Sequence, residues 1–355
     1  MSPKFYFATC QVGAEKAMKA EILKEFPHLN FAFSRPGFIT FKEKEGDHEE
    51  ITQTKSIFAR LWGTVVGQAK DPTQLTELLT TVPERSFLHL FERDTFVPGD
   101  DPDDFVLHAK IKNASMQIPE AIMKRCQVNA LPELGDEVYD LIWIDDFHVF
   151  LGRHVHHPAL DQAPGNQPFI HLPKNAPSRA YLKIVEAIHR FKPIVNQGDS
   201  VLEVGCSPGG ATTAMLKMGL KVTGVDPKYM DERLYSEKGF HFIQKLAKDI
   251  TPQDLKACNP DWIVMDMNIA PLEAIDELNH VLLCLRKNHG VGLKLRNAFL
   301  TIKLNDWKFA DSIPLYMRRL HECGFREMTA TQLNSNRQEF FVMARKFKIP
   351  HQLSF

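Results

Sequence analysis

Two lysines and two carboxylates stand where they could together move a proton. Asp266 ends one apolar run and Glu339 opens another, while Lys294 lies inside the alternating apolar segment GVGLKLRN. Lys183 lies in a segment with helical periodicity. A lysine is almost never buried without a partner. A lysine desolvated among other cations has a lowered pKa and can take a proton from a weakly acidic hydroxyl, such as that of a ribose. The carboxylates would hold and tune the lysines.

A predicted helix over residues 178–193 must position the first lysine. Ser178 is a plausible N-cap, Pro193 lies just past the helix end, and the apolar residues recur at helical spacing. Lys183 lies off that apolar stripe, on the same face as Arg179, four residues earlier.

Predicted strands must position the other three residues. We expect strands over 261–266, 290–295 and 339–347, alternating with helices over 210–218, 273–287 and 308–323. Such alternation is typical of a parallel sheet covered by helices, in which ligands bind at the carboxyl ends of the strands. Asp266, Lys294 and Glu339 are therefore expected to face one crevice, which Lys183 enters from the preceding helix.

A glycine-rich loop follows the predicted strand 200–204, in SVLEVGCSPGGATTAML. Its glycines allow a tight turn and let a ligand approach the backbone near the next helix N-terminus. A phosphate-binding loop would need a lysine where Ala211 stands, and Ser207 breaks the dinucleotide-binding pattern. The remaining interpretation is a site for S-adenosylmethionine. Asp226, at the end of the next strand, would accept hydrogen bonds from the ribose hydroxyls, and Asp249 would bind the adenine amine.

Length and composition agree with a protein of two domains. The chain has 355 residues, a net charge of -1, and six scattered cysteines without a paired-ligand spacing. The scattered cysteines favour reduced thiols in the cytoplasm, and no apolar run is long enough to span a membrane.

The histidines of RHVHHP (153–158) lack matching metal ligands, so we expect no metal. Arg296 and Lys303 are candidates to contact phosphates of a ligand near the crevice.

The chain changes character near its middle. Residues 1–160 read as a mixed α+β region, with an antiparallel sheet expected, residues 161–177 as a proline-rich linker, and residues 178–355 as a Rossmann-like α/β domain.

The motifs SRAYLK and VLEVGCSPGG, with Asp266, Lys294 and Glu339, resemble those of the FtsJ-type ribose 2′-O-methyltransferases. The resemblance implies a class I fold dependent on S-adenosylmethionine, a Lys183-Asp266-Lys294-Glu339 tetrad, and Lys294 as the general base. The sequence departs from the family pattern at Glu203, where aspartate is more usual. It also departs at Ala211 and Thr212, where an aromatic residue is usual. Either acid at position 203 can hold the amino end of the cofactor. The expected cofactor-binding residues are Ser178, Glu203, Gly205, Cys206, Ser207, Pro208, Gly209, Gly210, Asp226, Asp249 and Asp266.

The first half resembles the bacterial members of this family that methylate a cytidine ribose in 23S rRNA, notably in CQVGAEKAMKAEI and SIFARLWGTVVGQ. That resemblance implies an N-terminal RNA-binding region with a THUMP domain. It also implies that the partner is 23S rRNA or a large-subunit precursor, bound by a cytoplasmic monomer. Two alternatives stay open: 2′-O-methylation of another RNA, and a catalytically silent RNA-binding assembly factor.

Overall fold

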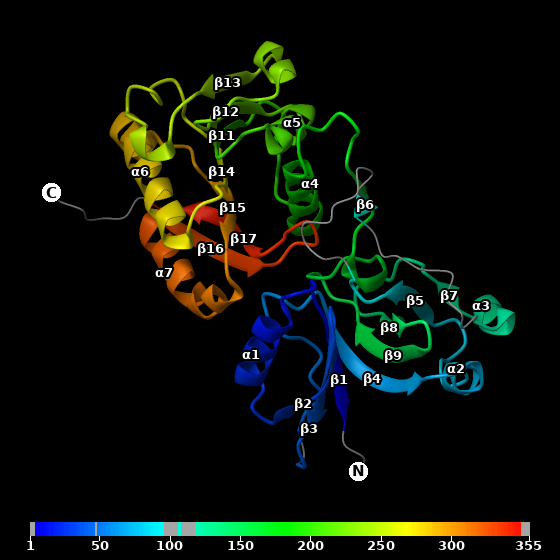
Figure 1. The fold of residues 1–355 in the computed structure, drawn as a ribbon. Coiled ribbons are helices and arrows are strands. Elements are labelled where there is room, and N and C mark those ends of the chain that lie inside the picture. The colour runs from blue at the N-terminus through cyan, green and yellow to red at the C-terminus, as the bar shows by residue number, and fades with distance from the viewer. Residues whose placement is uncertain (1–3, 47, 96–105, 108–117, 349–355) are drawn as a thin grey trace. The chain divides into compact units, whose positions relative to one another are not determined.

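The computed structural model describes residues 4–46, 48–95, 106–107 and 118–348. The chain divides into two compact units, Met1–Ile170 and His171–Phe355 (Figure 1). The expected acidic loop at 98–104 lies outside the described residues.

Within the described part of the first unit, an eight-stranded sheet has the order β2-β3-β1-β4-β9-β8-β5-β7. Its strands are β1 (Phe5–Thr9), β2 (Leu29–Arg35), β3 (Phe38–Glu43), β4 (Leu61–Ala69), β5 (Phe87–Glu92), β7 (Gln127–Val128), β8 (Glu137–Asp145) and β9 (His148–Val155). The expected antiparallel pairing holds except at one edge, where β5 runs parallel to both β7 and β8. Residues 93–136 give β5 and β8 a connection long enough for a parallel pair, which a short hairpin could not provide.

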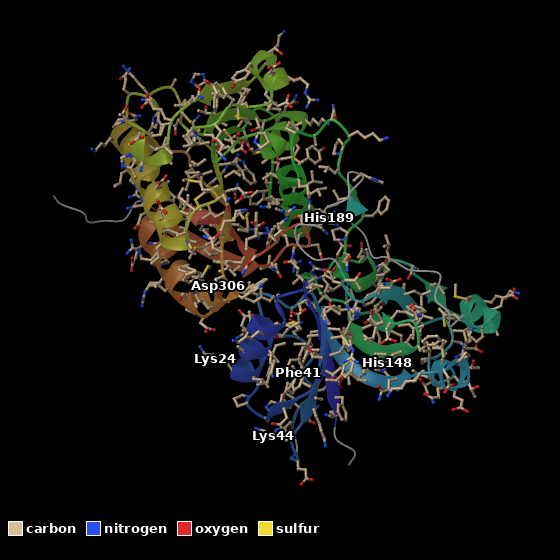
Figure 2. The ribbon with its side chains drawn as sticks, in the orientation of Figure 1. Lys24, Phe41, Lys44, His148, His189 and Asp306 are labelled. Carbon is tan, nitrogen blue, oxygen red and sulfur yellow. The ribbon has the colours of Figure 1, made fainter. Side chains whose placement is uncertain are left out.

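Helices and aromatic side chains cover this sheet. The helices are α1 (Glu15–Glu25), α2 (Pro72–Leu79) and α3 (Glu120–Arg125). Phe41 of β3 packs against Trp62 of β4 with ring centroids 6.0 Å apart. Figure 2 labels Phe41 among the side chains of this unit. Leu75 and Leu79 of α2 enter a second apolar cluster with Leu141 of β8. The short 3-10 turn η1 (Pro164–Asn166) follows, and β10 (Ile170–His171) pairs with β6 (Val106–Leu107).

The second unit is a seven-stranded sheet over the residues that the structure describes, in the order β13-β12-β11-β14-β15-β17-β16. Its strands are β11 (Ser200–Val204), β12 (Lys221–Val225), β13 (Phe240–Ile243), β14 (Trp262–Asp266), β15 (Asn297–Lys303), β16 (Phe325–Thr331) and β17 (Glu339–Phe347). The first five are parallel in the sheet, whereas β17 runs antiparallel to both β15 and β16. The order reverses between β11 and β14, and such a switch point is where open α/β sheets bind ligands.

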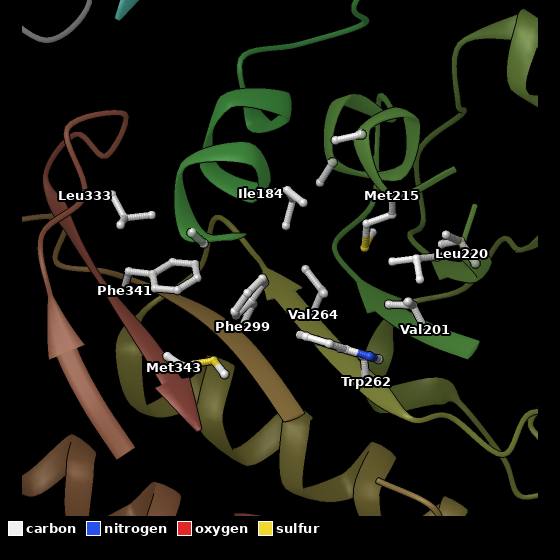
Figure 3. Packing of buried hydrophobic residues seen from close by; sticks show 14 residues of the cluster. Ile184, Val201, Met215, Leu220, Trp262, Val264, Phe299, Leu333, Phe341 and Met343 are labelled. Atoms are coloured by element: carbon white, nitrogen blue, oxygen red, sulfur yellow. The ribbon is translucent and has the colours of Figure 1, made fainter. Parts of the chain in front are cut away.

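Helices pack on both faces of this sheet, α4 and α5 on one and α6 and α7 on the other (Figure 1). Their bounds are α4 (Ala180–Phe191), α5 (Gly210–Lys217), α6 (Pro271–His289) and α7 (Ile313–Cys323), with the 3-10 turns η2 (Glu232–Ser236), η3 (Ala247–Asp249), η4 (Gly290–Gly292) and η5 (Trp307–Ser312). Ile184 of α4 and Met215 of α5 pack onto Val264, Phe299 and Phe341 of the strands (Figure 3). No described helix has both the length and the apolar character needed to cross a membrane.

One strand prediction is wrong, and the error matters for the site. Residues 290–295 form the turn η4 and an extended connection, and the strand begins at Asn297. The residues at 298–302 are all buried, whereas Val291 is fully exposed. A strand covered by helices on both faces buries consecutive apolar residues, and the run AFLTI meets that demand better than GVGLKL.

Candidate active site

Four charged side chains of the second unit form a closed ring of alternating sign. Lys183 Nζ lies 2.7 Å from Asp266 Oδ2 and 2.6 Å from Glu339 Oε1. Lys303 Nζ lies 2.8 Å from Asp266 Oδ1 and also pairs with Glu339 Oε2. Each lysine thus bridges both carboxylates, and the formal charges of the four groups sum to zero. We call this set, Lys183, Asp266, Lys303 and Glu339, the charge ring.

Strand register explains why these residues meet. The parallel pair β14 and β15 places Asp266 opposite Thr301, two residues before Lys303, at the carboxyl ends of both strands. Because β17 runs the other way, its first residue Glu339 pairs in register with Lys303, the last residue of β15. Helix α4 carries Lys183 to the same edge, packed on the sheet through its apolar stripe.

The structure does not bring Lys294 to this crevice, so its expected placement is wrong. Lys294 is exposed and precedes β15, and its backbone N–H donates to Asn259 Oδ1 at 3.1 Å. Lys303 lies at the other end of β15, whose six steps from Asn297 span about 20 Å at the usual rise per residue. The signal that could have identified Lys303 is the apolar run AFLTI, which ends at a lysine as the run before Asp266 ends at an aspartate.

The two residues expected to contact phosphates, Arg296 and Lys303, form ion pairs within the protein. Lys303 belongs to the charge ring. Arg296 lies just before β15, where its Nη2 is 2.6 Å from Asp199 Oδ2 and 3.7 Å from Asp261 Oδ1. Arg296 therefore sits at the amino ends of the strands, away from the charge ring.

Burial and charge shift the pKa values in the ring. Burial disfavours the ionised form of Glu339, but the two lysines outweigh it and hold the pKa of Glu339 well below its usual value. Burial likewise opposes ionisation of Lys303, but Asp266 and Glu339 raise its pKa. The unliganded ring therefore holds an ionised Glu339 and a protonated Lys303. Glu339 is the most enclosed member, with its side chain 3% exposed, whereas those of Asp266 and Lys303 are each 18% exposed.

The glycine loop lies beside the ring, at the switch point of the sheet. Gly205 has a φ of 84°, and a Cβ there would lie 2.6 Å from the carbonyl oxygen of Asp266. A Cβ on Gly210, in the first turn of α5, would lie 2.3 Å from Ser178 Oγ. Only glycine allows the loop between β11 and α5 to approach Asp266 and Ser178 this closely. The helix α4 itself is capped at Arg179, not Ser178, and without a side-chain hydrogen bond.

Acidic side chains surround this loop. Glu203 of β11 is buried and accepts a hydrogen bond of 2.5 Å from Thr212 Oγ1 of α5. Burial, with smaller contributions from the charges of Asp266 and Asp226, raises its pKa to about 8, although the Thr212 hydrogen bond opposes the shift. Asp226, after β12, accepts from the backbone N–H groups of Ser207 and Lys228 at 3.0 and 2.8 Å.

The remaining expected cofactor residues fall into three settings. Cys206 is buried against Met230, and burial raises the pKa of its thiol far above the usual value. Pro208 is exposed in the loop, while Gly209 is buried and caps α5. Asp249 ends the turn η3 and is exposed. A neutral thiol such as that of Cys206 is a poor nucleophile, so this loop serves packing and backbone approach.

The loop before β17 contributes contacts that the sequence did not reveal. Asn336 Nδ2 donates to Glu339 Oε1 at 2.9 Å, and the backbone N–H of Arg337 reaches the same oxygen at 3.3 Å. Both Asn336 and Glu339 are buried. The sequence offered only a polar run, NSNRQ, which is equally typical of a solvated turn.

The histidines of RHVHHP lie in the first unit, where His154 and His156 are buried. His154 Nδ1 lies 2.6 Å from Asp140 Oδ2, and both side chains are buried. Among the residues that the structure describes, no three histidine, cysteine or acidic side chains are arranged to hold a metal ion.

Comparisons with known proteins identify the class of domain to which these residues belong. Residues 176–346 match the model of the FtsJ-like methyltransferases. These residues therefore form an FtsJ-like methyltransferase domain, and S-adenosylmethionine is its cofactor. The glycine loop and its acidic neighbours, at the switch point of the sheet, fit such a ligand.

Relatives extend the similarity over the whole chain. The Ribosomal RNA large subunit methyltransferase M of Tolumonas auensis is 27% identical over 286 residues, which cover 73% of this chain and 74% of that protein. The protein of that name from Pectobacterium atrosepticum is 25% identical, covering 95% of each chain. The one from Pseudoalteromonas translucida is 22% identical, covering 97% of this chain and 98% of its own.

Proposed function

We propose that the protein transfers a methyl group from S-adenosylmethionine to the ribose 2′-hydroxyl of a cytidine in large-subunit ribosomal RNA. The observation that carries this proposal is the charge ring beside the glycine loop. It supplies two lysines that can exchange protons and two carboxylates that hold them. The names and nearly full-length coverage of the relatives support ribosomal RNA as the substrate, and such a substrate places the reaction in the cytoplasm.

We assign to Lys303 the role of general base that the family resemblance implied for Lys294. Together with Asp266 it forms the more open side of the ring, so a hydroxyl can approach it. Bound S-adenosylmethionine would give up its methyl group to the ribose 2′-oxygen, with the sulfur as leaving group. Lys303 Nζ, once deprotonated, would take the hydroxyl proton and later release it to water. The cofactor supplies the methyl group and a sulfonium charge.

Lys303 must lose a proton before it can act as the base, because its pKa is raised in the unliganded protein. The carboxylates keep it protonated in the unliganded ring. A positive sulfonium bound nearby would disfavour a second positive charge and so would lower the pKa of Lys303 in the complex. The rate of methyl transfer is therefore expected to rise with pH until Lys303 is neutral in the complex.

The first unit, with its eight-stranded sheet, is proposed to bind RNA through a THUMP-like region. The cofactor-binding roles remain as proposed from the sequence: Glu203 for the amino end, Asp226 for the ribose hydroxyls and Asp249 for the adenine amine. A silent assembly factor would have no use for two lysines locked between two carboxylates, so the ring favours an enzyme.

A direct assay tests the proposal. The purified protein is incubated with isotopically labelled S-adenosylmethionine and ribosomal RNA from cells that lack the enzyme. Methylated nucleosides are then located by mass spectrometry. A label on the 2′-oxygen of one cytidine in large-subunit RNA is the expected result. A label on a base, or none on any RNA, would overturn the proposal.

A further inference from the structure

A buried glutamate on α4 lies one turn beyond Lys183. Glu186 is 1% exposed, and its carboxylate is directed at the connection between β16 and β17, residues 332–338. Its Oε1 accepts from Asn334 N at 2.6 Å and Asn334 Nδ2 at 3.2 Å. Its Oε2 accepts from Ser335 N at 2.8 Å and Ser335 Oγ at 2.6 Å. Four donors match the four acceptor positions of a carboxylate.

The same connection fixes Glu339. Asn336 Nδ2 and Arg337 N donate to the Glu339 carboxylate. Gln332 Nε2 donates to the carbonyl oxygens of Arg337 and Glu339 at 2.9 and 3.3 Å. The residues that Glu186 binds and those that bind Glu339 are adjacent in the chain. A displacement of Asn334 and Ser335 would therefore be passed on to Glu339.

Helix α4 connects the charge ring to the loop between β16 and β17, because it carries both Lys183 and Glu186. These residues are three positions apart on one helix and move together. Lys183 holds Glu339 Oε1 at 2.6 Å, while Glu186 holds the connection that carries Glu339. A carboxylate is costly to bury, and a polar group deep in a protein has to satisfy its hydrogen bonds. An apolar residue at position 186 would pack well but could not hold the connection.

We propose that Glu186 is a positioning residue for methyl transfer, which anchors the connection between β16 and β17 so that Glu339 stays between Lys183 and Lys303. This inference rests on the proposed function only for its activity readout. Glu186 has no contact with the reacting atoms, and it acts through Glu339.

The variant Glu186→Gln tests this role with little change in shape. The amide replaces two acceptor positions by donors, which oppose the N–H groups of Asn334 or Ser335. We expect turnover to fall about 10- to 100-fold, the usual cost of losing a supporting contact. The KM for RNA and the affinity for the cofactor should stay within about two-fold, because the residue displaced is Glu339, which is not among the expected cofactor-binding residues.

The pH profile distinguishes positioning from a loss of stability. Glu339 helps to raise the pKa of Lys303. A displaced Glu339 lowers that pKa, so the profile of the variant should shift to lower pH. Asp199→Asn is the matched control: Asp199 is also a buried carboxylate that accepts backbone, indole and guanidinium donors, but at the opposite end of the sheet. It should be destabilised without any shift of the profile.

Lysine side-chain NMR supplies a readout that needs no RNA. The Nζ signal of Lys303 in the unliganded protein near neutral pH should differ between Glu186→Gln and the wild type, because a displaced Glu339 no longer pairs with that ammonium group. An unchanged Lys303 Nζ signal in a folded variant would overturn the positioning role. So would an equal shift in Asp199→Asn. Failure of the wild type to methylate ribose would instead overturn the proposed function, and the Lys303 Nζ signal would still decide the role of Glu186.

Discussion

The two ends of the parallel sheet carry charged clusters that share strands β14 and β15. The amino-end cluster adds residues at the start of β11, whereas the carboxyl-end cluster adds β17 and helix α4. At the amino ends, Asp199 accepts from Trp262 Nε1 at 3.1 Å and from Arg296 Nη2 at 2.6 Å. Asp261 accepts from Ser200 N at 3.0 Å. At the carboxyl ends, the carboxylates of Asp266 and Glu339 meet two lysines.

The donors make the difference between these clusters. A backbone N–H, an indole and a guanidinium keep their protons at any physiological pH, so the amino-end cluster can only hold the structure together. A lysine is a cation whose pKa moves with its surroundings, so the carboxyl-end cluster can exchange a proton. Charge and burial alone therefore do not identify a catalytic centre. The chemistry of the donors does.

The largest effect is expected from Lys303→Met, which keeps the length of the side chain and removes the amine. Methyl transfer should fall about 10³-fold, within the range of general-base catalysis, while cofactor affinity stays within about two-fold. Single-turnover assays and calorimetry measure the two quantities. Turnover close to that of the wild type would show that the ring, like the amino-end cluster, is only structural.

A second test concerns Glu203, which lies near the carboxyl end of β11, beside the charge ring. Its buried carboxyl should make the stability of the protein depend on pH. Its pKa is raised to about 8 from 4.5, chiefly by burial, so the folded protein retains a proton that the unfolded chain releases. The unliganded protein should therefore lose stability as pH rises from 4.5 to 8, by at most about 1.4 kcal/mol per pH unit from this group. Urea unfolding should show a smaller loss over that range in Glu203→Gln. Equal pH dependence in both proteins would contradict the buried, protonated carboxyl.

At the amino ends, Asp199→Asn should affect stability alone. The amide cannot accept from all the donors that meet Asp199, and Arg296 keeps only the longer contact with Asp261. We expect the free energy of unfolding to fall by about 1–3 kcal/mol, with turnover unchanged at temperatures where the variant is folded. A selective loss of activity without destabilisation would mean that this end takes part in the reaction.

The smallest effect is expected from Lys294→Ala. Its side chain is exposed and lies at the wrong end of β15 for the charge ring. Turnover and unfolding midpoint should both match the wild type, with differences within about 0.5 kcal/mol, as is usual for surface substitutions. This variant is the matched control for Lys303→Met, because each removes one amine from the same segment of the chain.

The sequence predicted most of the second unit because local patterns there are strong. Alternating strands and helices indicated the parallel sheet, and Asp266 and Glu339 lie at the strand ends where they were expected. Lys303 was missed because GVGLKLRN and NAFLTIK both look like strands, and only pairing with β14 decides between them. The role of Glu186 was beyond prediction, since its four donors come from residues about 150 positions away.

The antiparallel insertion of β17 between β15 and β16 has a consequence for mutational tolerance. Glu339 reaches Lys303 only because these residues pair in register. Side chains alternate between the two faces of a strand, so deletion of a single residue in the connection before β17 could turn Glu339 to the other face without removing any residue of the ring. Such a deletion would leave all four residues of the charge ring in the sequence and still abolish methyl transfer.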